Sequence, residues 1–230
     1  MNDLSTINVA EFISQNSKNY SDKLAIVDDN KSITYGELDR KSKQFAYYLT
    51  EQGAVSGDRI IILMEDCVEW VVAWLSAIRI GCTTVIVNNR ISGERLPEII
   101  KFSKAKIAVS NMSDTDFSSR FINAGLSVVG KDIIMQEHLG SIDTYYSHHP
   151  DEISYWFTTS GSGGGQKIVA HRHKSLPVMV EKLTFDYGVD DTSVFHSIPK
   201  LGFSFGFIDM MLSLMSNATS YISCQLPSPS

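Results

Sequence analysis

A short segment rich in glycine, hydroxyl side chains and a single lysine has the residue types that hold polyphosphates. It reads TTSGSGGGQK and runs from Thr158 to Lys167. Glycine lets backbone N–H groups approach a ligand closely, and successive N–H groups can form concave sites for anions. The segment therefore predicts a site for the phosphates of a nucleotide, with Lys167 as a positive charge. A Gly/Ser turn without a ligand is the alternative, which composition alone does not exclude.

Two common phosphate-binding motifs do not fit this segment. In the Walker motif counted from Gly161, Gln166 stands where glycine is required and Ile168 stands where a hydroxyl residue is required. The dinucleotide-binding motif follows a strand and opens a helix, whereas KIVAH after this loop is typical of a second strand. The glycine loop is therefore predicted to join two strands.

The segments before the loop alternate between strand and helix patterns. Thr34 and Glu37 have the spacing of a capping box at the start of a helix, and Gly53 is expected to end that helix. The run DRIIILM is continuously apolar, as in parallel strands that are buried on both faces. Further strands are predicted at 83–88, 106–110 and 126–130, with helices at 67–81, 92–105 and 114–125. This alternation predicts an α/β fold with a doubly wound, mainly parallel sheet.

Composition and residue spacing argue against several classes of partner and site. The 230 residues include 20 Lys and Arg against 26 Asp and Glu, so binding to nucleic acid is not expected. Cys67, Cys82 and Cys224 lack metal-binding spacing, and His148 and His149 lack partners, so reduced thiols and no protein-bound metal are predicted. The first residues do not resemble a signal peptide, and no apolar run is long enough to span a membrane. A cytoplasmic location is therefore expected.

The glycine segment resembles the phosphate loop of the AMP-forming adenylating enzymes, which include acyl-CoA synthetases, luciferases and adenylation domains of peptide synthetases. In that superfamily the loop contains two hydroxyl residues, glycine, another hydroxyl residue, threonine, glycine, any residue, proline, lysine and glycine. Gly163 replaces the threonine here, Gln166 replaces the proline and Ile168 replaces the last glycine. ITYGELDRKSKQFAYYL and AIRIGCTTVIVN also resemble family segments, so the resemblance covers nearly the whole chain in the family's order.

The resemblance implies a ligase that activates a carboxylic acid with ATP, which arrives with Mg²⁺. The carboxylate would attack the α-phosphate to give an acyl-adenylate and pyrophosphate, and a thioester with coenzyme A or a carrier-protein thiol would follow. Lys167 would be the catalytic residue that offsets phosphate charge. The residues expected to hold the β- and γ-phosphates with it are Thr159, Ser160, Gly161, Ser162, Gly163, Gly164 and Gly165.

The segment PKLGFSFGF resembles the KLFFAYG type found in ligases for benzoate and related aromatic acids. By this resemblance Phe203, Phe205 and Gly206 would form the acid pocket, and an aromatic acid would be favoured. Phe203, Phe205 and Phe207 also alternate as residues in a strand would, so ordinary core packing is the alternative. His196 is interpreted as a structural residue.

The resemblance also predicts the domain organisation. The chain would be the N-terminal portion of an AMP-dependent ligase domain, with subregions 1–135 and 152–230 joined by a linker. The family's YGxTE and TGD motifs and its C-terminal lid are not found in this sequence. A complementary C-terminal half or a homo-oligomer is therefore a candidate partner. The apolar segment 203–224 is expected to be exposed and to promote association.

Two other functional hypotheses remain open from the sequence. One is a catalytically silent, adenylation-like module that binds a partner or a nucleotide. The other is a generic α/β domain in which the glycine loop is only a hairpin turn.

Overall fold

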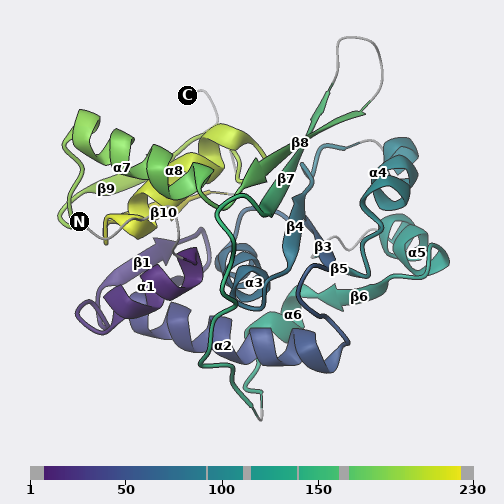
Figure 1. Ribbon diagram of the computed structural model, residues 1–230, viewed down its shortest axis with the longest axis horizontal. Helices are drawn as coiled ribbons and strands as arrows, with labels where there is room; N and C mark the ends of the chain where they lie inside the picture. Colours follow the sequence, from purple (N-terminus) through teal and green to yellow (C-terminus); the bar gives the residue numbers. More distant parts are fainter. Residues whose placement is uncertain (1–7, 92, 111–114, 139, 161–165, 224–230) are drawn as a thin grey trace.

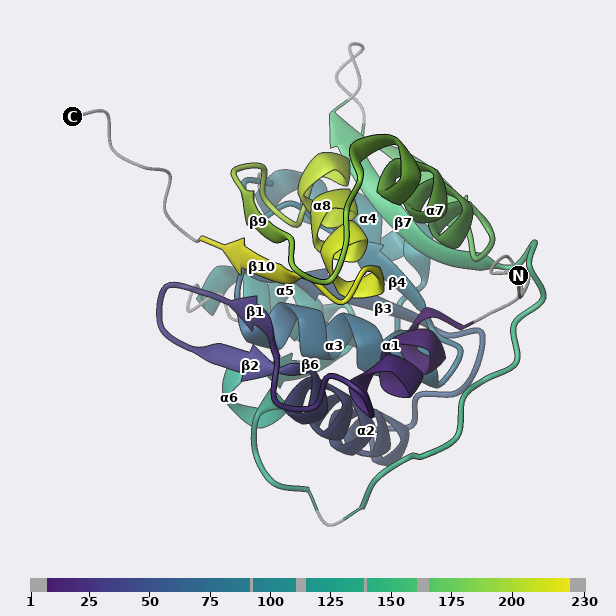
Figure 2. The ribbon, with the colours of Figure 1, turned by 90° about the vertical axis from the view of Figure 1, so that its left-hand side faces the viewer.

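Two sheets and the helices around them form the fold of this chain. The computed structural model describes residues 8–91, 93–110, 115–138, 140–160 and 166–223. Within these ranges a six-stranded and a four-stranded sheet lie on either side of a buried helix (Figure 1 and Figure 2). None of the helices in the described ranges is both long and apolar enough to cross a membrane.

The strands and helices have the following bounds. The strands are β1 (Leu24–Val27), β2 (Ser32–Thr34), β3 (Arg59–Leu63), β4 (Thr83–Ile86), β5 (Ile107–Ser110), β6 (Ser127–Gly130), β7 (Ile153–Ser160), β8 (Gln166–Arg172), β9 (Val194–Ser197) and β10 (Thr219–Ile222). The helices are α1 (Val9–Ser17), α2 (Tyr35–Glu51), α3 (Val68–Arg79), α4 (Leu96–Ser103), α5 (Thr115–Asn123), α6 (Lys131–Ile134), α7 (Ser175–Tyr187) and α8 (Ser204–Met215), with a 3-10 turn, η2 (Gly93–Arg95).

The six-stranded sheet has the order β6-β5-β3-β4-β7-β8, and all neighbours are parallel except the last pair. Its faces are covered by different helices. Ile61 and Leu63 of β3 pack in a cluster with α4 and α5, whereas Ile60 and Ile62 belong to the larger core that contains α3. Both faces of β3 are therefore buried, which accounts for its continuous apolar run. The predicted doubly wound, mainly parallel α/β fold is confirmed.

The four-stranded sheet has the order β2-β1-β10-β9 and joins the two ends of the described chain. β1 pairs with β10 in parallel, with Ile26 opposite Ser220, and β10 pairs with β9 in parallel. This sheet was not predicted as a separate unit, and β9 was not predicted at all. Pairing between strands nearly two hundred residues apart leaves no local pattern in the sequence.

Helix α3 lies between the two sheets and is buried along its whole length. Trp70 and Trp74 are fully buried in it. Arg79 at its end is also buried and pairs with Asp39 of α2 at 2.9 Å. A helix with apolar residues on every side fits only such an interior position.

The capping box predicted at the start of α2 is confirmed. The Glu37 backbone N–H donates to Thr34 Oγ1 at 3.2 Å, and the Thr34 N–H donates to a Glu37 carboxylate oxygen at 3.0 Å. Gly53 follows the helix with a φ of +84°, the left-handed conformation that glycine adopts readily.

The predicted strand-like alternation of Phe203, Phe205 and Phe207 is wrong. Phe203 is the N-cap residue of α8, and Phe205 and Phe207 lie within its first turn. Phe207 and residues 210–215 are buried against both sheets, so the expected exposure of segment 203–224 is wrong for these residues, whereas Phe203 and Phe205 are exposed. A mostly apolar twelve-residue run suits a buried helix better than a strand.

Candidate functional site

The glycine loop connects two antiparallel strands, and the sequence correctly predicts that it joins two strands. β7 and β8 are antiparallel, with Thr159 opposite Lys167 and Ser160 opposite Gln166. In Figure 1 this hairpin extends beyond the helices that flank it. Lys167 is exposed next to the loop. The predicted phosphate-binding residues between the strands, Gly161, Ser162, Gly163, Gly164 and Gly165, lie outside the described residues.

The loop follows the carboxyl end of a strand that belongs to the parallel sheet. β7 pairs with β4 in parallel, with Tyr155 opposite Thr84 and Phe157 opposite Ile86. Thr158 Oγ1 donates to the Ile86 carbonyl at 3.4 Å and fastens this end of β7 to β4. Ligands of open α/β sheets bind outside the carboxyl ends of the strands, which is where this loop begins.

A cluster of aromatic rings fixes the start of α8 beside β7. The Phe207 ring centroid lies 4.8 Å from that of Tyr155 and 5.4 Å from that of Phe157, both on β7. Its centroid is 5.2 Å from that of Trp74 and 6.2 Å from that of Trp70, both on α3. The structure therefore brings the segment predicted to bind the acid next to the strand that leads into the predicted phosphate loop.

The residues predicted for the acid pocket differ in accessibility. Phe203 and Phe205 are exposed, at 46% and 74% of their surfaces, so neither is a core residue. The core alternative therefore holds only for Phe207. Gly206 is buried, and its role is close packing. A Cβ at this position would lie 2.3 Å from the Pro199 carbonyl oxygen.

The loop between β9 and α8 also packs closely on the end of β4. A Cβ added to Gly202 would lie 2.9 Å from Asn88 Cα, so the two backbone segments are in direct contact. Asn88 lies two residues after the end of β4, and its side chain accepts a hydrogen bond from the Arg90 N–H at 2.9 Å. Glycine is required here because any side chain would separate the loop from β4.

A buried carboxylate that sequence reasoning missed holds the same loop. The Leu201 N–H donates to Asp66 Oδ1 at 3.1 Å, and Lys200 Nζ lies 4.0 Å from Asp66 Oδ2. Burial raises the pKa of Asp66 to about 6, although the Leu201 N–H and Lys200 oppose this shift. Lys200 also donates to the Ser223 carbonyl. The signal in the sequence was an acidic residue just after a parallel strand, where functional side chains gather.

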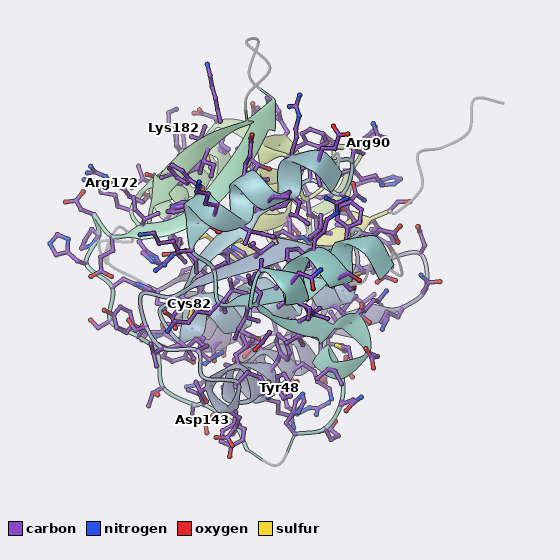
Figure 3. The ribbon with its side chains drawn as sticks, turned by 90° about the vertical axis from the view of Figure 1, so that its right-hand side faces the viewer. Tyr48, Cys82, Arg90, Asp143, Arg172 and Lys182 are labelled. Atoms are coloured by element: carbon purple, nitrogen blue, oxygen red, sulfur yellow. The ribbon has the colours of Figure 1, made fainter. Side chains whose placement is uncertain are left out.

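Histidines pack along the hairpin and at its base. His171 of β8 stacks on Tyr155, with ring centroids 4.7 Å apart. His173, just beyond β8, stacks on His148 at 3.4 Å, and burial together with His148 lowers the pKa of His173 to about 3. At the end of β8 Arg172 pairs with Asp151 at 2.8 Å, away from the loop (Figure 3).

The described residues offer neither a group of metal ligands nor a reactive thiol. Within the described ranges, no three His, Cys, Asp or Glu side chains are grouped so that they could hold a metal ion. Cys67 and Cys82 are free and buried, and burial raises the pKa of both thiols to about 12. Such thiols are poor nucleophiles at neutral pH because they stay protonated. Cys224 lies outside the described residues.

Known proteins resemble this chain in sequence. A 3-hydroxybenzoate--CoA/4-hydroxybenzoate--CoA ligase of Thauera aromatica is 27% identical over 180 residues, which cover 72% of this chain and 34% of that enzyme. Tyrocidine synthase 1 of Brevibacillus parabrevis is 25% identical over 217 residues, covering 93% of this chain and 20% of that protein. The chain thus spans a fifth to a third of the length of these two relatives.

A solved structure and a family model agree with these relatives. The structure of a benzoate CoA ligase from Burkholderia xenovorans LB400 matches with a TM-score of 0.88 and 22% identity, over 96% of this chain and 46% of that one. This likeness shows the fold. The model of the AMP-binding enzyme family matches residues 13–229. The fold, the glycine loop between β7 and β8, and this match over nearly all residues show that the chain belongs to the family of AMP-binding enzymes.

Proposed function

We propose that the chain forms the part of an AMP-forming acid ligase that binds the phosphates of ATP and the acid. The observation that carries this proposal is the position of the glycine loop. It follows the carboxyl end of β7, and the start of α8 is held beside β7 by Phe207. Phosphate donors and an acid pocket would then be neighbours at one edge of the sheet.

In the proposed reaction a carboxylate oxygen attacks the α-phosphorus of ATP. The bond between that phosphorus and the oxygen that bridges to the β-phosphate breaks, so pyrophosphate leaves and an acyl-adenylate remains. A thiol sulfur then attacks the acyl carbon, loses its proton and displaces AMP to give a thioester. Positioning and charge stabilisation supply most of the rate in such steps.

Each predicted site residue has a role in this proposal. Backbone N–H groups and hydroxyls from Thr159 to Gly165 would hold the β- and γ-phosphates, and Lys167 would offset their charge. Mg²⁺ would enter as the complex with ATP. Phe203 and Phe205 would flank the acid, with Gly206 allowing α8 to start close to the Pro199 carbonyl. Asp66 would position the loop through the Leu201 N–H.

We propose an aromatic carboxylic acid as the substrate class, with coenzyme A or a carrier protein as the thiol. Two exposed phenylalanines at the start of α8 offer flat apolar surfaces for such an acid. Similarity to hydroxybenzoate ligases supports the same class. Because the chain spans less than half of these enzymes, a complementary C-terminal segment would complete the site. The cytoplasm is the proposed location.

The proposal is tested by the affinity for ATP with Mg²⁺, measured by calorimetry on the 230-residue chain. Lys167→Ala should weaken binding by about tenfold, because a charge-assisted contact to phosphate is lost. The melting temperature should hardly change, since Lys167 is exposed. Lys182→Ala on α7, an exposed lysine, is the matched control and should bind ATP as the natural chain does. Equal affinities of all three chains would exclude a phosphate role for the loop.

The silent module remains a second candidate because the loop departs from the family pattern at Gly163, Gln166 and Ile168. Acid-dependent exchange between ATP and pyrophosphate separates the two candidates. A silent module would bind nucleotide without exchange for any acid. We expect no exchange from the 230-residue chain alone, so the assay is run with the complementary C-terminal segment added. Exchange that needs an aromatic acid would then exclude the silent module.

A further inference from the structure

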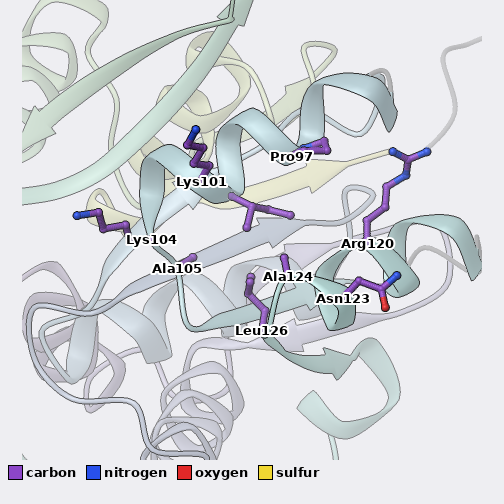
Figure 4. Close-up of a pocket in the computed structure, with 9 residues that line it drawn as sticks. Pro97, Lys101, Lys104, Ala105, Arg120, Asn123, Ala124 and Leu126 are labelled. Atoms are coloured by element: carbon purple, nitrogen blue, oxygen red, sulfur yellow. The ribbon is translucent and has the colours of Figure 1, made fainter.

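We propose that the groove between α4 and α5 is a second ligand site, which takes a small organic anion with an apolar body. The groove has a volume of about 730 Å³. Cationic side chains line it, namely Lys101, Lys104 and Arg120, together with an apolar floor that includes Ile100, Ala105 and Leu126. Figure 4 shows these side chains around the groove, on two helices that cover the same face of the six-stranded sheet.

The charge around this groove differs in sign from that of the whole chain. The chain has a formal net charge of −6, yet the lining residues that the structure describes include three cations and no carboxylate. Both Lys101 and Lys104 are exposed, and within the described ranges neither forms a salt bridge. Two exposed lysines that form no salt bridge, beside an apolar floor, favour a ligand that carries the opposite charge.

The side chain of Arg59, and not that of Lys101 or Lys104, contacts the last carbonyl groups of α4. Lysines near a helix C-terminus commonly interact with the last carbonyl groups and offset the helix dipole. In α4 the Arg59 guanidinium does this: Nε donates to the Ser103 carbonyl at 2.7 Å and Nη2 donates to the Lys104 carbonyl at 3.0 Å. The ammonium groups of Lys101 and Lys104 are therefore not needed to cap α4.

The apolar floor of the groove indicates that the uncharged part of the ligand is apolar. Ile100, Ala105 and Leu126 are each less than a tenth exposed, and they present apolar surface between the cations. The volume falls in the range of about 300–1,000 Å³ that is typical of small-molecule sites. An aromatic or acyl body with one carboxylate, sulfonate or phosphate would bury apolar area on the floor and place its charge among the lysines.

The groove is separate from the proposed ATP site. Lys104 and Ala105 lie within three residues of the start of β5, and Leu126 directly precedes β6, so this end of the groove lies at the amino ends of the parallel strands. The glycine loop follows the carboxyl end of β7. Because β4, β5, β6 and β7 all run in parallel, these are opposite edges of the sheet. The inference therefore does not rest on the proposed ligase activity.

The test uses two fluorescent probes that differ mainly in charge. The anion is 8-anilinonaphthalene-1-sulfonate, and N-phenyl-1-naphthylamine is its neutral counterpart. Amide chemical shifts of the 230-residue chain are followed as each probe is added. We expect the anion to shift amides in residues 97–105 and 120–126, with the neutral probe shifting them far less.

Two variants and a control complete the experiment. Lys101→Gln/Lys104→Gln should weaken anion binding at this groove by about threefold to tenfold, because two partly exposed ion pairs are lost. Ala124→Phe should also weaken it, because Ala124 is exposed and its larger replacement would fill the groove. Lys182→Gln on α7 should leave binding unchanged.

Other results would overturn the inference. Shifts centred on Phe203 and Phe205 would show that the anion binds exposed phenylalanines instead. Equal binding of the charged and neutral probes would remove the role of the cations. Unchanged anion binding by Lys101→Gln/Lys104→Gln would also remove the role of the cations, provided that circular dichroism shows the fold of this variant to be retained.

Discussion

Asp66 accepts a hydrogen bond from the loop before α8, and its ionisation should make the stability of the fold depend on pH. Burial raises its pKa from 3.8 to about 6, so the folded chain holds a proton between these values that the unfolded chain releases. This group therefore adds stability as the pH falls from about 6 to about 4, and it costs stability above pH 6. Its charged form still accepts the Leu201 N–H, so the cost is offset only in part.

We predict that Asp66→Asn removes this pH dependence. The change in the free energy of unfolding between pH 4 and pH 7 should differ from that of the natural chain by up to about 3 kcal/mol, the equivalent of a shift of about two pKa units. Urea unfolding at several pH values measures it. Asp186→Asn on α7, where the side chain is 41% exposed and pairs with Lys182, is the control. Identical pH profiles for Asp66→Asn and the natural chain would contradict the assignment.

The ionisation of His173 should make stability depend on pH in the opposite direction to that of Asp66. Burial and the stacked His148 lower the pKa of His173 from 6.5 to about 3, so the unfolded chain binds a proton that the folded chain does not. Stability is therefore lost as the pH falls from about 6.5 towards 3. His173→Gln should make the chain less sensitive to acid in this window, by thermal unfolding at pH 7 and pH 5. An unchanged acid sensitivity would show that the stacked pair does not titrate as described.

At the scale of elements, the contact between α8 and the loop before it depends on a glycine. An alanine Cβ at position 206 would lie 2.3 Å from the Pro199 carbonyl oxygen and 2.5 Å from that of Lys200. We expect Gly206→Ala to destabilise the fold by about 1–3 kcal/mol, because the helix must move away from the backbone. Ser204→Ala in the same turn is exposed and should cost much less. Equal urea midpoints for the two variants would contradict this packing.

Local patterns predicted most elements, and long-range contacts account for the rest. The capping box of α2, the alternation from β3 to β6 and the hairpin around the glycine loop were all readable because their signals lie within a few residues. The alternation of Phe203, Phe205 and Phe207 led to a wrong strand prediction, because alternate phenylalanines fit the start of a buried helix as well as a strand. The role of Asp66 was hidden because its partner Leu201 is 135 residues away.

At the scale of the whole molecule, α3 couples the two sheets into one core. Ile26 of β1 and Ile60 of β3 belong to the same buried cluster, with α3 between them. Ile26→Ala should therefore cost about 2–5 kcal/mol and lower the hydrogen-exchange protection of β3 amides as much as that of β1 amides. Unchanged protection in β3 would show that the sheets open separately.

The claim that the glycine loop binds the phosphates of ATP is tested most directly by mapping where ATP with Mg²⁺ binds. Amide chemical shifts of the 230-residue chain are recorded during a titration with this complex. The account predicts the largest shifts at Thr158, Thr159, Ser160 and Lys167, with their loss in Lys167→Ala. Shifts confined to residues 97–105 and 120–126 of the α4–α5 groove would contradict it, because ATP would then bind the cations of that groove and not the loop.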